Sequence, residues 1–486
     1  MRRCRIGIVG GGPGGLMAAY FLQKYANCPI SITLLEASNR LGGKVQTEKF
    51  KTADITYELG AAELYDYSIN GSDSLRELVE ELGLPTQSMQ GVGVIIDGRW
   101  IGNTTDFREV YGEQEYKNLL EFHRRAQDYI LPQEFYAADH PDGLPSLLAT
   151  TGFMPFLELF ASPVVQRYIQ TLIHSDLATE PRLTSTTYGL QNYLMNDSKY
   201  MELYCIEGGN ERLIHELIRR IDVDIRLNSS AEAIFKTKNG TLAIESVCQD
   251  QRDLEEFDYV VVALPHNHLN SVSYSGNLLQ PAVRQHFEYY NHPAHYLRMT
   301  LLFERPFWRH WLKESFCMLD QFGGCCLYDE SVRQPGIEMG ILGWLIGGDA
   351  AEQMSLLSDE VLIEMALQSL PHELAIGKNL LKEGIVKRWV KAVNALPGGQ
   401  RAPALSIRHC PEPIEHANLF FVGDYLFDST LNGVLDSAEY VAGWITANLM
   451  QPQNNNASSL GIRNCVKSVI DSETNQAKYA LQTVIS

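Results

Sequence analysis

Cys4-Arg-Ile-Gly-Ile-Val9, followed directly by Gly10-Gly-Gly-Pro-Gly-Gly15, is the stretch that decides the fold of this chain. The apolar run 4–9 predicts a short buried strand, and the glycine-rich residues after it end that strand. A helix is expected over 16–25 and a second strand over 30–35. Strand, helix and strand within roughly 30 residues form a βαβ unit, which predicts an α/β, Rossmann-like fold with a parallel sheet.

The glycines of this turn have the spacing Gly10-x-Gly12-x-x-Gly15. Glycine permits a tight turn, close approach of the backbone to a pyrophosphate, and packing of the helix on the sheet. Free N–H groups and the dipole at a helix N-terminus stabilise phosphate charge. Glu36 ends the second strand, where a carboxylate accepts hydrogen bonds from ribose hydroxyls and disfavours a 2′-phosphate. The pattern predicts a dinucleotide site and does not by itself distinguish FAD from NAD.

Composition excludes several other classes of protein. The chain has 486 residues, 45% hydrophobic and 20% charged, which is the balance of an ordinary soluble protein with room for two domains. A formal net charge of -19 repels phosphate backbones, so nucleic-acid binding is not expected. No apolar run reaches the roughly 18 residues of a membrane span.

The cysteines indicate a reducing compartment. The chain has nine of them, an odd number, without paired spacing of the CxxC kind. We therefore expect free thiols in a cytoplasmic protein and no metal site. The first strand begins too early to leave room for a signal peptide. Whether the chain forms a homodimer stays open.

Periodicity predicts the remaining elements. The region from about 70 to 200 is expected to be mainly helical, and a polar linker with a C-terminal tail is expected over 451–486. Helices are expected over 74–82, 116–130, 213–221 and 434–449. Strands are expected over 224–227, 231–235, 259–264, 297–303, 337–346, 385–390 and 419–422.

The residues after the second strand carry a family resemblance. Glu36-Ala37-Ser-Asn-Arg40-Leu-Gly-Gly43-Lys44 resembles a segment of the flavin-containing amine oxidases. This superfamily includes monoamine, polyamine and L-amino-acid oxidases, protoporphyrinogen oxidase and carotenoid desaturases. Lys44 stands where the family usually has Arg, which keeps a cation but loses a bidentate fork. Further similar segments follow in order: 57–61, 207–213, 260–265, and 419–424 with 432–438.

The resemblance implies FAD as the cofactor and assigns residues to it. The FAD domain would comprise 1–70, 205–290 and 405–450, and a discontinuous α+β substrate domain would comprise 71–204 and 291–404. The residues assigned to FAD are Gly10, Gly12, Pro13, Gly14, Gly15, Glu36, Ala37, Arg40, Gly43, Lys44, Gly60, Ala61, Ala231, Gly423, Asp424, Gly433, Val434 and Leu435. The segment 397–401 has neither Tyr nor Cys for covalent attachment, so the FAD is expected to be noncovalent.

The resemblance also points to the catalytic wall of the site. Amine oxidases commonly carry a Lys eight residues before a "PFW" element; here Pro306-Phe-Trp308 is present and Arg298 stands at that position. Arg cannot act as a base near neutrality, but it can position a water or, together with Arg401, bind a substrate carboxylate. Trp389 matches a Trp that the family often places near the flavin. Val434 occupies a position that is usually aromatic, so the expected aromatic cage is not evident.

Three functions stay open at this point. The first is an oxidase that takes hydride from a C–H next to an amine and passes electrons to dioxygen. The second is a dehydrogenase or desaturase of a carbon skeleton with little oxygen reactivity, because the usual Lys is absent. The third is a non-catalytic flavin-binding subunit. All three take a small molecule or FAD as ligand.

Overall fold

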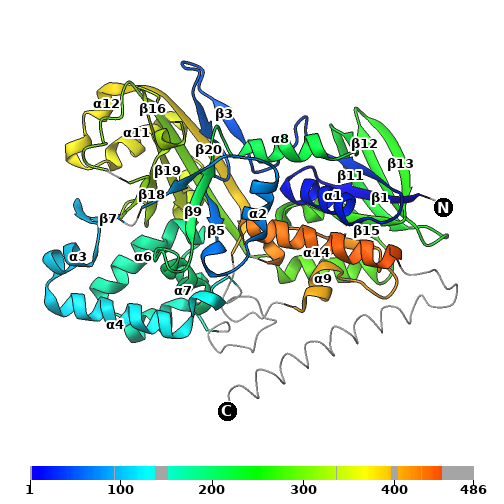
Figure 1. Cartoon of the computed structure of the whole chain (residues 1–486), viewed down its shortest axis with the longest axis horizontal. Helices are drawn as coiled ribbons and strands as arrows, with labels where there is room; N and C mark the ends of the chain where they lie inside the picture. Colours follow the sequence, from blue (N-terminus) through cyan, green and yellow to red (C-terminus); the bar gives the residue numbers. More distant parts are fainter. Residues whose placement is uncertain are drawn as a thin grey trace, which may run out of the picture.

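The computed structural model describes residues 3–91, 93–136, 151–312, 314–334, 336–395, 403–427 and 429–450. The chain forms two lobes side by side (Figure 1). One lobe contains a five-stranded sheet in the order β10-β2-β1-β14-β21. All pairs in it are parallel, which confirms the predicted Rossmann-like α/β fold. Its strands are β10 (Asp224–Arg226), β2 (Ile30–Leu35), β1 (Cys4–Val9), β14 (Tyr259–Val262) and β21 (Leu419–Phe421).

The two faces of this sheet are covered differently because its strands alternate. Ile6 and Ile8 pack on the helical side, into one core with helix α1 (Pro13–Tyr25), α2 (Ser74–Glu81), α8 (Glu211–Arg220) and α14 (Leu431–Met450). A four-stranded sheet covers the other face, where a Cβ on Gly7 would lie 2.8 Å from Ile244. Its strands are β11 (Ser229–Lys236), β12 (Leu242–Cys248), β13 (Gln251–Phe257) and β15 (Ser273–Ser275).

The second lobe is built on a seven-stranded sheet in the order β20-β16-β19-β18-β17-β7-β8. Helices α10, α11 and α12 lie on one face and the α3–α7 cluster lies toward the other (Figure 1). Its strands are β20 (Leu381–Asn394), β16 (Pro293–Phe303), β19 (Gly340–Gly347), β18 (Cys325–Asp329), β17 (Phe316–Leu319), β7 (Gly93–Ile96) and β8 (Arg99–Ile101). The helices are α3 (Thr104–Tyr111), α4 (Glu113–Tyr129), α5 (Phe153–Phe160), α6 (Pro163–Leu177), α7 (Thr186–Leu194), α10 (Gly348–Met354), α11 (Asp359–Ser369) and α12 (Gly377–Leu380).

Apart from short 3-10 helices, two small sheets and two α-helices make up the rest of the regular structure in the described residues. The three-stranded sheet has the order β5-β9-β6, so that β9 lies between two strands that precede it by more than 100 residues. These elements are β3 (Thr47–Lys49), β4 (Thr56–Glu58), β5 (Leu64–Asp66), β6 (Thr86–Met89), β9 (Glu202–Ile206), α9 (Leu279–Tyr289) and α13 (Leu405–His409). The five-stranded sheet draws only on 1–70, 205–290 and 405–450, whereas the functional division into two domains stays a prediction.

The region from about 70 to 200 is mainly helical, as expected, but it also contains three short strands that the sequence did not indicate, β6, β7 and β8. These strands are too short, at three or four residues, to show a strand period against the helices around them. They stabilise the lobe by joining other strands, since β7 pairs with β17 and β6 pairs with β9.

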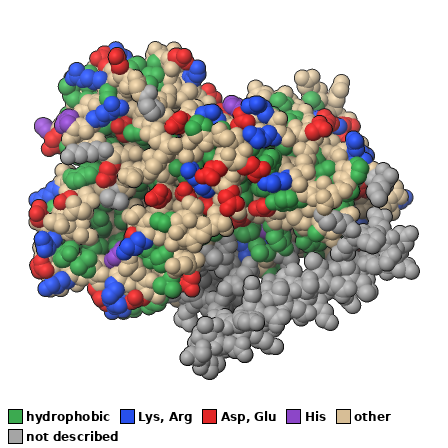
Figure 2. Space-filling view, in the orientation of Figure 1, with side chains coloured by type: hydrophobic (Ala, Val, Ile, Leu, Met, Phe, Trp, Pro, Cys, Tyr) green, Lys and Arg blue, Asp and Glu red, His purple; other side chains and the backbone are tan. Residues whose placement is uncertain are grey.

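The surface charge and the state of the cysteines agree with the composition of the chain. Acidic side chains gather across the middle of the face in Figure 2, in keeping with the negative net charge. The eight cysteines of the described residues are free thiols. Within the described part of the chain, no helix is long and apolar enough to cross a membrane, and no group of three or more metal-ligating side chains is found.

Candidate functional site

A cleft of about 240 Å³ opens at the carboxyl ends of three parallel strands. Residues 12–14 follow β1, 263–265 follow β14, and 422–424 follow β21, and all nine line this central cleft. In parallel α/β sheets, ligands bind outside the carboxyl ends of the strands, where helix N-termini also meet. The fold therefore places the glycine turn in the location that a dinucleotide needs.

The glycine turn has room for no side chain at two of its positions. Gly10 has φ +106°, and a Cβ there would lie 2.5 Å from the Ala263 carbonyl oxygen. A Cβ on Gly15 would lie 2.0 Å from the Gly10 carbonyl oxygen. Gly12 is the N-cap of α1 and supplies no side chain to its first turn, so the backbone N–H groups there are left for a ligand.

Glu36 closes the turn from the second strand. Its carboxylate accepts the N–H of Gly11 at 2.7 Å and the N–H of Ser38 at 2.8 Å. These bonds fix the side chain beside the turn and leave lone pairs for ribose hydroxyls. Ala37 is exposed next to it, while Ala231 is buried on β11. Ser229, at the start of that strand, donates its N–H to the Glu36 carbonyl, so β11 begins at the same end of the turn.

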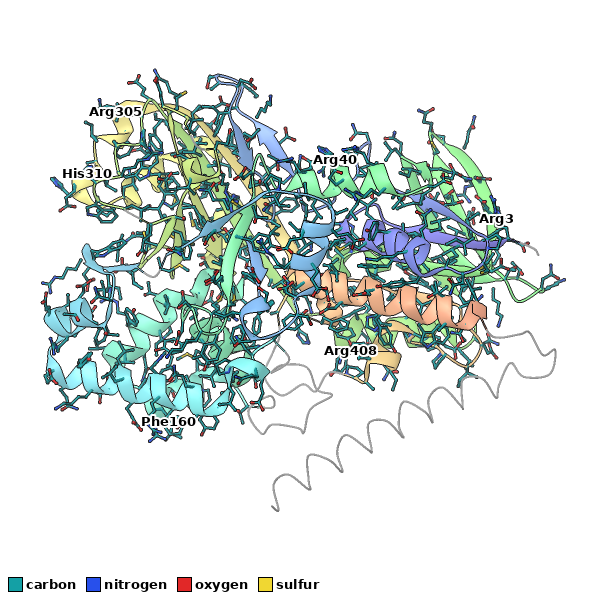
Figure 3. All side chains as sticks on the ribbon, in the orientation of Figure 1. Arg3, Arg40, Phe160, Arg305, His310 and Arg408 are labelled. Atoms are coloured by element: carbon teal, nitrogen blue, oxygen red, sulfur yellow. The ribbon has the colours of Figure 1, made fainter. Side chains whose placement is uncertain are left out.

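The loop 40–44 is held by Arg40 and extends into the cleft through Lys44. Arg40, labelled beside α8 in Figure 3, donates to the Gly43 carbonyl at 2.9 Å and pairs with Glu211 of α8 at 2.9 Å. It does not line the cleft, so its role here is to hold the loop. Gly43 and Lys44 do line it. Lys44 Nζ donates to the Ala392 carbonyl at 2.6 Å and pairs with Asp424 at 3.1 Å.

The closing segment brings the C-terminal helix to the same cleft. Helix α14 begins at Leu431, three residues earlier than the sequence indicated, because Thr430 caps it by accepting the N–H groups of Gly433 and Val434. Val434 lines the cleft, whereas Gly433 and Leu435 do not, and Leu435 is fully buried in the core. The helix packs along α1, so the N-termini of two helices converge on the cleft.

Gly60 and Ala61 form the part of the cleft wall that lies against Lys44. A Cβ on Gly60 would lie 1.8 Å from the Lys44 carbonyl, and Ala61 donates its N–H to that same carbonyl at 3.0 Å. Only glycine therefore allows the backbone to pass so close to Lys44. Both residues line the cleft.

Arg298 lines the cleft from the second lobe and is almost fully buried, with 2% of its surface exposed. It does not lie free on its strand: its guanidinium pairs with the buried Glu330 and donates to the Glu58 carbonyl at 3.0 Å. Gly343 makes room for this pair, because a Cβ there would lie 2.5 Å from Glu330. The positive charge of Arg298 is thus already compensated inside the protein.

Trp389 and Tyr296 lie opposite each other on paired strands and both line the cleft. The Trp389 indole donates to the Leu59 carbonyl at 2.8 Å, and the Lys387 ammonium lies 4.5 Å from its ring centroid. Tyr296 and Arg298 are two residues apart on β16 and therefore face the same side. Arg401, the second arginine proposed for carboxylate binding, and the segment 397–401 lie outside the described residues.

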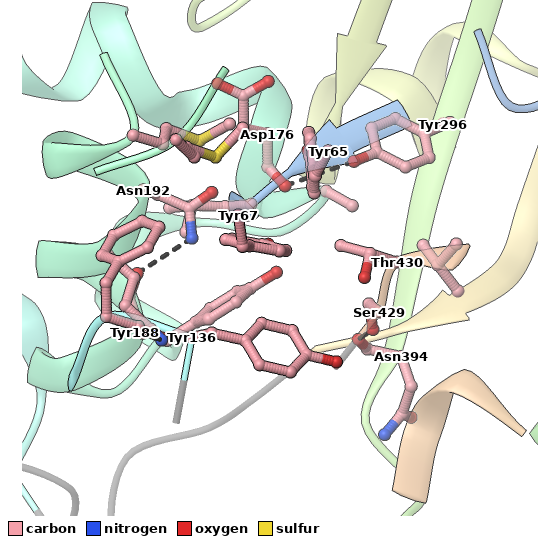
Figure 4. Close-up of a pocket in the computed structure, with 17 residues that line it drawn as sticks. Tyr65, Tyr67, Tyr136, Asp176, Tyr188, Asn192, Tyr296, Asn394, Ser429 and Thr430 are labelled. Atoms are coloured by element: carbon pink, nitrogen blue, oxygen red, sulfur yellow. Dashed lines mark hydrogen bonds between the residues drawn. The ribbon is translucent and has the colours of Figure 1, made fainter. Parts of the chain in front are cut away.

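A cavity lined by tyrosines adjoins the cleft and was missed in the sequence (Figure 4). We call it the tyrosine cavity; Tyr65 and Tyr296 line both spaces, and the Tyr296 hydroxyl donates to the Asp176 carbonyl at 3.2 Å. Its other aromatic residues are Tyr67, Phe135, Tyr136 and Tyr188. One signal was available: Asp176 lies four residues after Leu172 on α6, which places an acid on the buried side of an apolar helix.

Carboxyl groups around these spaces have raised pKa values. Burial, reinforced by the nearby Glu63 carboxylate, raises the pKa of Asp176 to about 8. Burial likewise raises the pKa of Glu58 to about 7, partly opposed by the Arg333 guanidinium. A buried carboxyl with a raised pKa is neutral until a cation arrives beside it.

The residues present fit an FAD. Two helix N-termini converge on the cleft, and glycines stand where the backbone makes its closest approaches. Of the predicted residues, those that line the cleft are Gly12, Pro13, Gly14, Gly43, Lys44, Gly60, Ala61, Arg298, Trp389, Gly423, Asp424 and Val434. Those that do not line it are Gly10, Gly15, Glu36, Ala37, Arg40, Ala231, Gly433 and Leu435.

Comparison with known proteins agrees with this geometry. The family model of flavin containing amine oxidoreductases matches residues 13–446. A solved structure of wild-type putrescine oxidase bound to putrescine superposes with a TM-score of 0.73 at 20% identity, over 92% of this chain and 99% of that one. Cyclohexylamine oxidase from Brevibacterium oxydans IH-35A gives 0.71 at 15% identity, over 93% of this chain and 100% of that one.

Curated relatives match over shorter stretches. Coproporphyrinogen III oxidase of Bacillus subtilis is 40% identical over 80 residues, 16% of each chain. The flavin-dependent L-tryptophan oxidase RebO of Lentzea aerocolonigenes is 26% identical over 258 residues, 47% of this chain and 52% of that protein. These matches span at most about half the length of either relative. The match over residues 13–446, together with the glycine turn and its cleft, shows that the chain belongs to the flavin containing amine oxidoreductase family.

Proposed function

We propose that this protein is an oxidoreductase that binds FAD noncovalently in the central cleft and oxidises a small amine at the carbon next to the nitrogen. The substrate is a cation, held in the tyrosine cavity between aromatic rings and the carboxyl group of Asp176. Dioxygen is the proposed electron acceptor. The free thiols of the described cysteines support a reducing compartment, in agreement with the cytoplasmic location expected from the sequence.

The observation that carries this proposal is the charge around the substrate space. Asp176 lines the tyrosine cavity, Glu63 lines the cleft beside it, and Arg298 is neutralised by Glu330. A substrate carboxylate would meet two acids and an arginine that already has a partner. A protonated amine would instead ionise Asp176 and lie against the electron-rich faces of Tyr65 and Tyr296. The described residues therefore favour a cationic amine over the carboxylate-bearing substrate that the sequence suggested.

The chain's own residues have separable roles in this scheme. The N-terminus of α1 and the glycine turn would hold the pyrophosphate, and Glu36 the ribose. Lys44 and Asp424 bridge the first and last segments of the cleft, and the N-terminus of α14 adds a partial positive charge. When bound, FAD supplies the hydride acceptor. Tyr65 and Tyr296 orient the amine, and Trp389 closes the wall behind it.

One observation favours a second candidate, a dehydrogenase with little oxygen reactivity. Arg298 occupies the position of the usual Lys, and its guanidinium, which is paired with Glu330, stays protonated near neutral pH and cannot exchange a proton. If the usual Lys assists reaction with dioxygen, Arg298 would leave reoxidation slow.

Anaerobic mixing with a panel of substrates tests the proposal. Primary and secondary alkyl amines should bleach the flavin absorbance, whereas the corresponding carboxylic acids should not. Admission of air then separates the candidates, since rapid recovery of colour with hydrogen peroxide indicates an oxidase. A flavin that dithionite reduces but no amine bleaches would contradict both the amine substrate and the oxidase.

A further inference from the structure

We infer that the substrate reaches the tyrosine cavity through a separate acidic channel, the methionine passage, which admits protonated alkyl amines and rejects anions. This inference rests on the proposed function, because it names the route and the charge of that substrate. The methionine passage is a cavity of about 320 Å³. Its lining combines acidic side chains with methionines and other apolar residues.

The inner end of the passage shares its wall with the site. Tyr65 lines the passage, the tyrosine cavity and the central cleft. Asp176, Met195 and Met201 line both the passage and the tyrosine cavity, and Glu63 lines both the passage and the cleft. A molecule at Asp176 is therefore at the wall that separates the passage from the substrate space.

The outer end reaches the surface. Ser88, Gln90, Ser198 and Glu202 line the passage and are exposed. Ser88 lies on β6 and Gln90 directly follows that strand, while Ser198 precedes β9 and Glu202 begins it. Ser88 and Glu202 lie on strands of the same three-stranded sheet, so this sheet forms one rim of the opening.

Charge makes the passage selective. Four of its lining residues are acids, Glu63, Asp176, Glu202 and Glu314, and no Lys, Arg or His is among the described residues that line it. The Arg333 guanidinium lies 4.0 Å from Glu63, and the raised pKa of Asp176 keeps that carboxyl neutral until a cation reaches it, so Glu202 and Glu314 supply the negative charge that an entering cation meets first. A narrow space lined by one sign of charge concentrates ions of the opposite sign and raises their rate of entry.

The rest of the lining suits an alkyl chain. Met89, Met195, Met201 and Met318 line the passage together with Leu203 and Phe316. Methionine is unbranched and changes rotamer easily, so such walls adapt to a moving apolar chain. An ammonium group with an alkyl tail matches both the acids and the methionines.

A competing opening lies on the other side of the tyrosine cavity. This outer pocket, of about 250 Å³, shares Tyr67, Phe135 and Tyr136 with the tyrosine cavity and has Ser72 among its exposed lining residues. The two acidic residues that line this pocket, Asp73 and Asp436, already accept hydrogen bonds from the protein. Asp73 accepts the N–H groups of Tyr67 and Arg76, each at 2.8 Å, and Asp436 accepts the Tyr136 hydroxyl. It therefore attracts a cation less than the methionine passage does.

The test replaces one exposed serine at each opening and compares how fast the two variants bind a substrate analogue that cannot be oxidised. tert-Butylamine has no hydrogen on the carbon next to nitrogen, so its binding is measured without turnover, by stopped-flow change of flavin absorbance in the FAD-loaded protein. Ser198→Trp, which narrows the methionine passage, should lower its association rate at least tenfold. Ser72→Trp, which narrows the outer pocket, should leave the rate unchanged. Both variants should keep the wild-type FAD content and melting temperature.

Charge is tested separately. Glu202→Lys should slow tert-butylammonium, reduce the salt dependence of its association rate, and leave the neutral analogue tert-butanol unaffected. Pivalate, the anion of the same shape, should not bind. The inference would be overturned if Ser72→Trp alone slowed association, or if neither Trp variant slowed it. It would also be overturned if pivalate bound as well as tert-butylammonium.

The outcomes also separate this inference from the proposed function. If Ser198→Trp slows tert-butylammonium but no amine bleaches the flavin, the passage stands and the amine oxidation fails. If amines bleach the flavin and Ser198→Trp leaves the association rate unchanged, the function stands and the passage fails.

Discussion

At the scale of single residues, Arg298 shows that a buried side chain can have its charge taken up by a partner that the sequence does not reveal. In the sequence it is a cation available to a substrate; in the structure it is half of a buried ion pair with Glu330. The pair joins β16 to the turn after β18, residues far apart in the chain. No local pattern signals such a contact, which is why the sequence could not reveal it.

Breaking this pair should cost stability rather than only substrate affinity. Arg298→Met leaves Glu330 buried with Arg333 as its remaining cation, and loss of one partner from a buried pair costs about 3–5 kcal/mol. Denaturant unfolding should show this loss. Arg298→Met combined with Glu330→Gln should recover part of it. Simple addition of the two single losses would mean that the two side chains do not stabilise each other.

Glu58 predicts a pH dependence of stability. Burial raises its pKa to about 7 in the folded protein, from 4.5 for a glutamate exposed to water. A carboxyl whose folded pKa is raised contributes stability below its unfolded pKa and loses it as pH rises through the folded pKa. The wild type should therefore lose about 3 kcal/mol between pH 4.5 and 7 from this group, at about 1.4 kcal/mol per unit.

Glu58→Gln isolates this contribution. The variant keeps an acceptor for the Asn210 N–H and removes the titrating group. The difference in melting temperature between variant and wild type should grow in favour of the variant from pH 5 to pH 8. A difference that is constant over this range would show that Glu58 does not titrate there.

At the scale of elements, strands and helices with strong local signals were predicted well. β1 and β2 have the expected bounds, because each is a short apolar run ended by a clear signal. Helix α1 begins at Pro13 rather than Leu16, since proline is suited to the first turn. Helix α14 also begins early, because the Thr430 side chain caps it, a contact that the sequence analysis did not identify. Strands β6 to β8 depend on partners distant in sequence and gave no usable period.

The glycine turn gives a prediction at this scale. Gly15→Ala places a Cβ 2.0 Å from the Gly10 carbonyl oxygen, so the turn must shift. FAD affinity should fall more than tenfold and the melting temperature should drop. Equilibrium dialysis and thermal unfolding measure both.

Gly443 provides the matched control. It lies within α14 and an added Cβ would meet no atom within 4 Å. Gly443→Ala should stabilise the protein by about 0.5–1 kcal/mol, the difference in helix propensity, and leave FAD affinity unchanged. Equal behaviour of the two alanine variants would contradict the tight turn.

At the scale of the whole molecule, the cleft depends on segments from the beginning, middle and end of the chain. The sequence predicted this assembly, because ordered motifs placed 10–15, 260–265 and 419–424 at strand ends. It did not predict the tyrosine cavity, whose walls come from β5, α6, α7 and β16. Those residues meet only through tertiary packing, so the cofactor side of the site could be anticipated and the substrate side could not.

Because distant segments share the cleft, FAD should stabilise the molecule as a unit. A ligand at 100 times its dissociation constant adds about 2.7 kcal/mol to the free energy of unfolding. Removal of FAD should lower the melting temperature, and saturating FAD should restore it. No change on removal would mean that the cofactor does not connect the segments.

The most direct test of the central claim is the absorbance spectrum of the purified protein, with titration of the colourless form by FAD. We predict a yellow protein with flavin bands, or a colourless one that binds one FAD per chain and regains them, with the cofactor released on denaturation. A protein that stays colourless in excess FAD, with no change in melting temperature, would contradict the account.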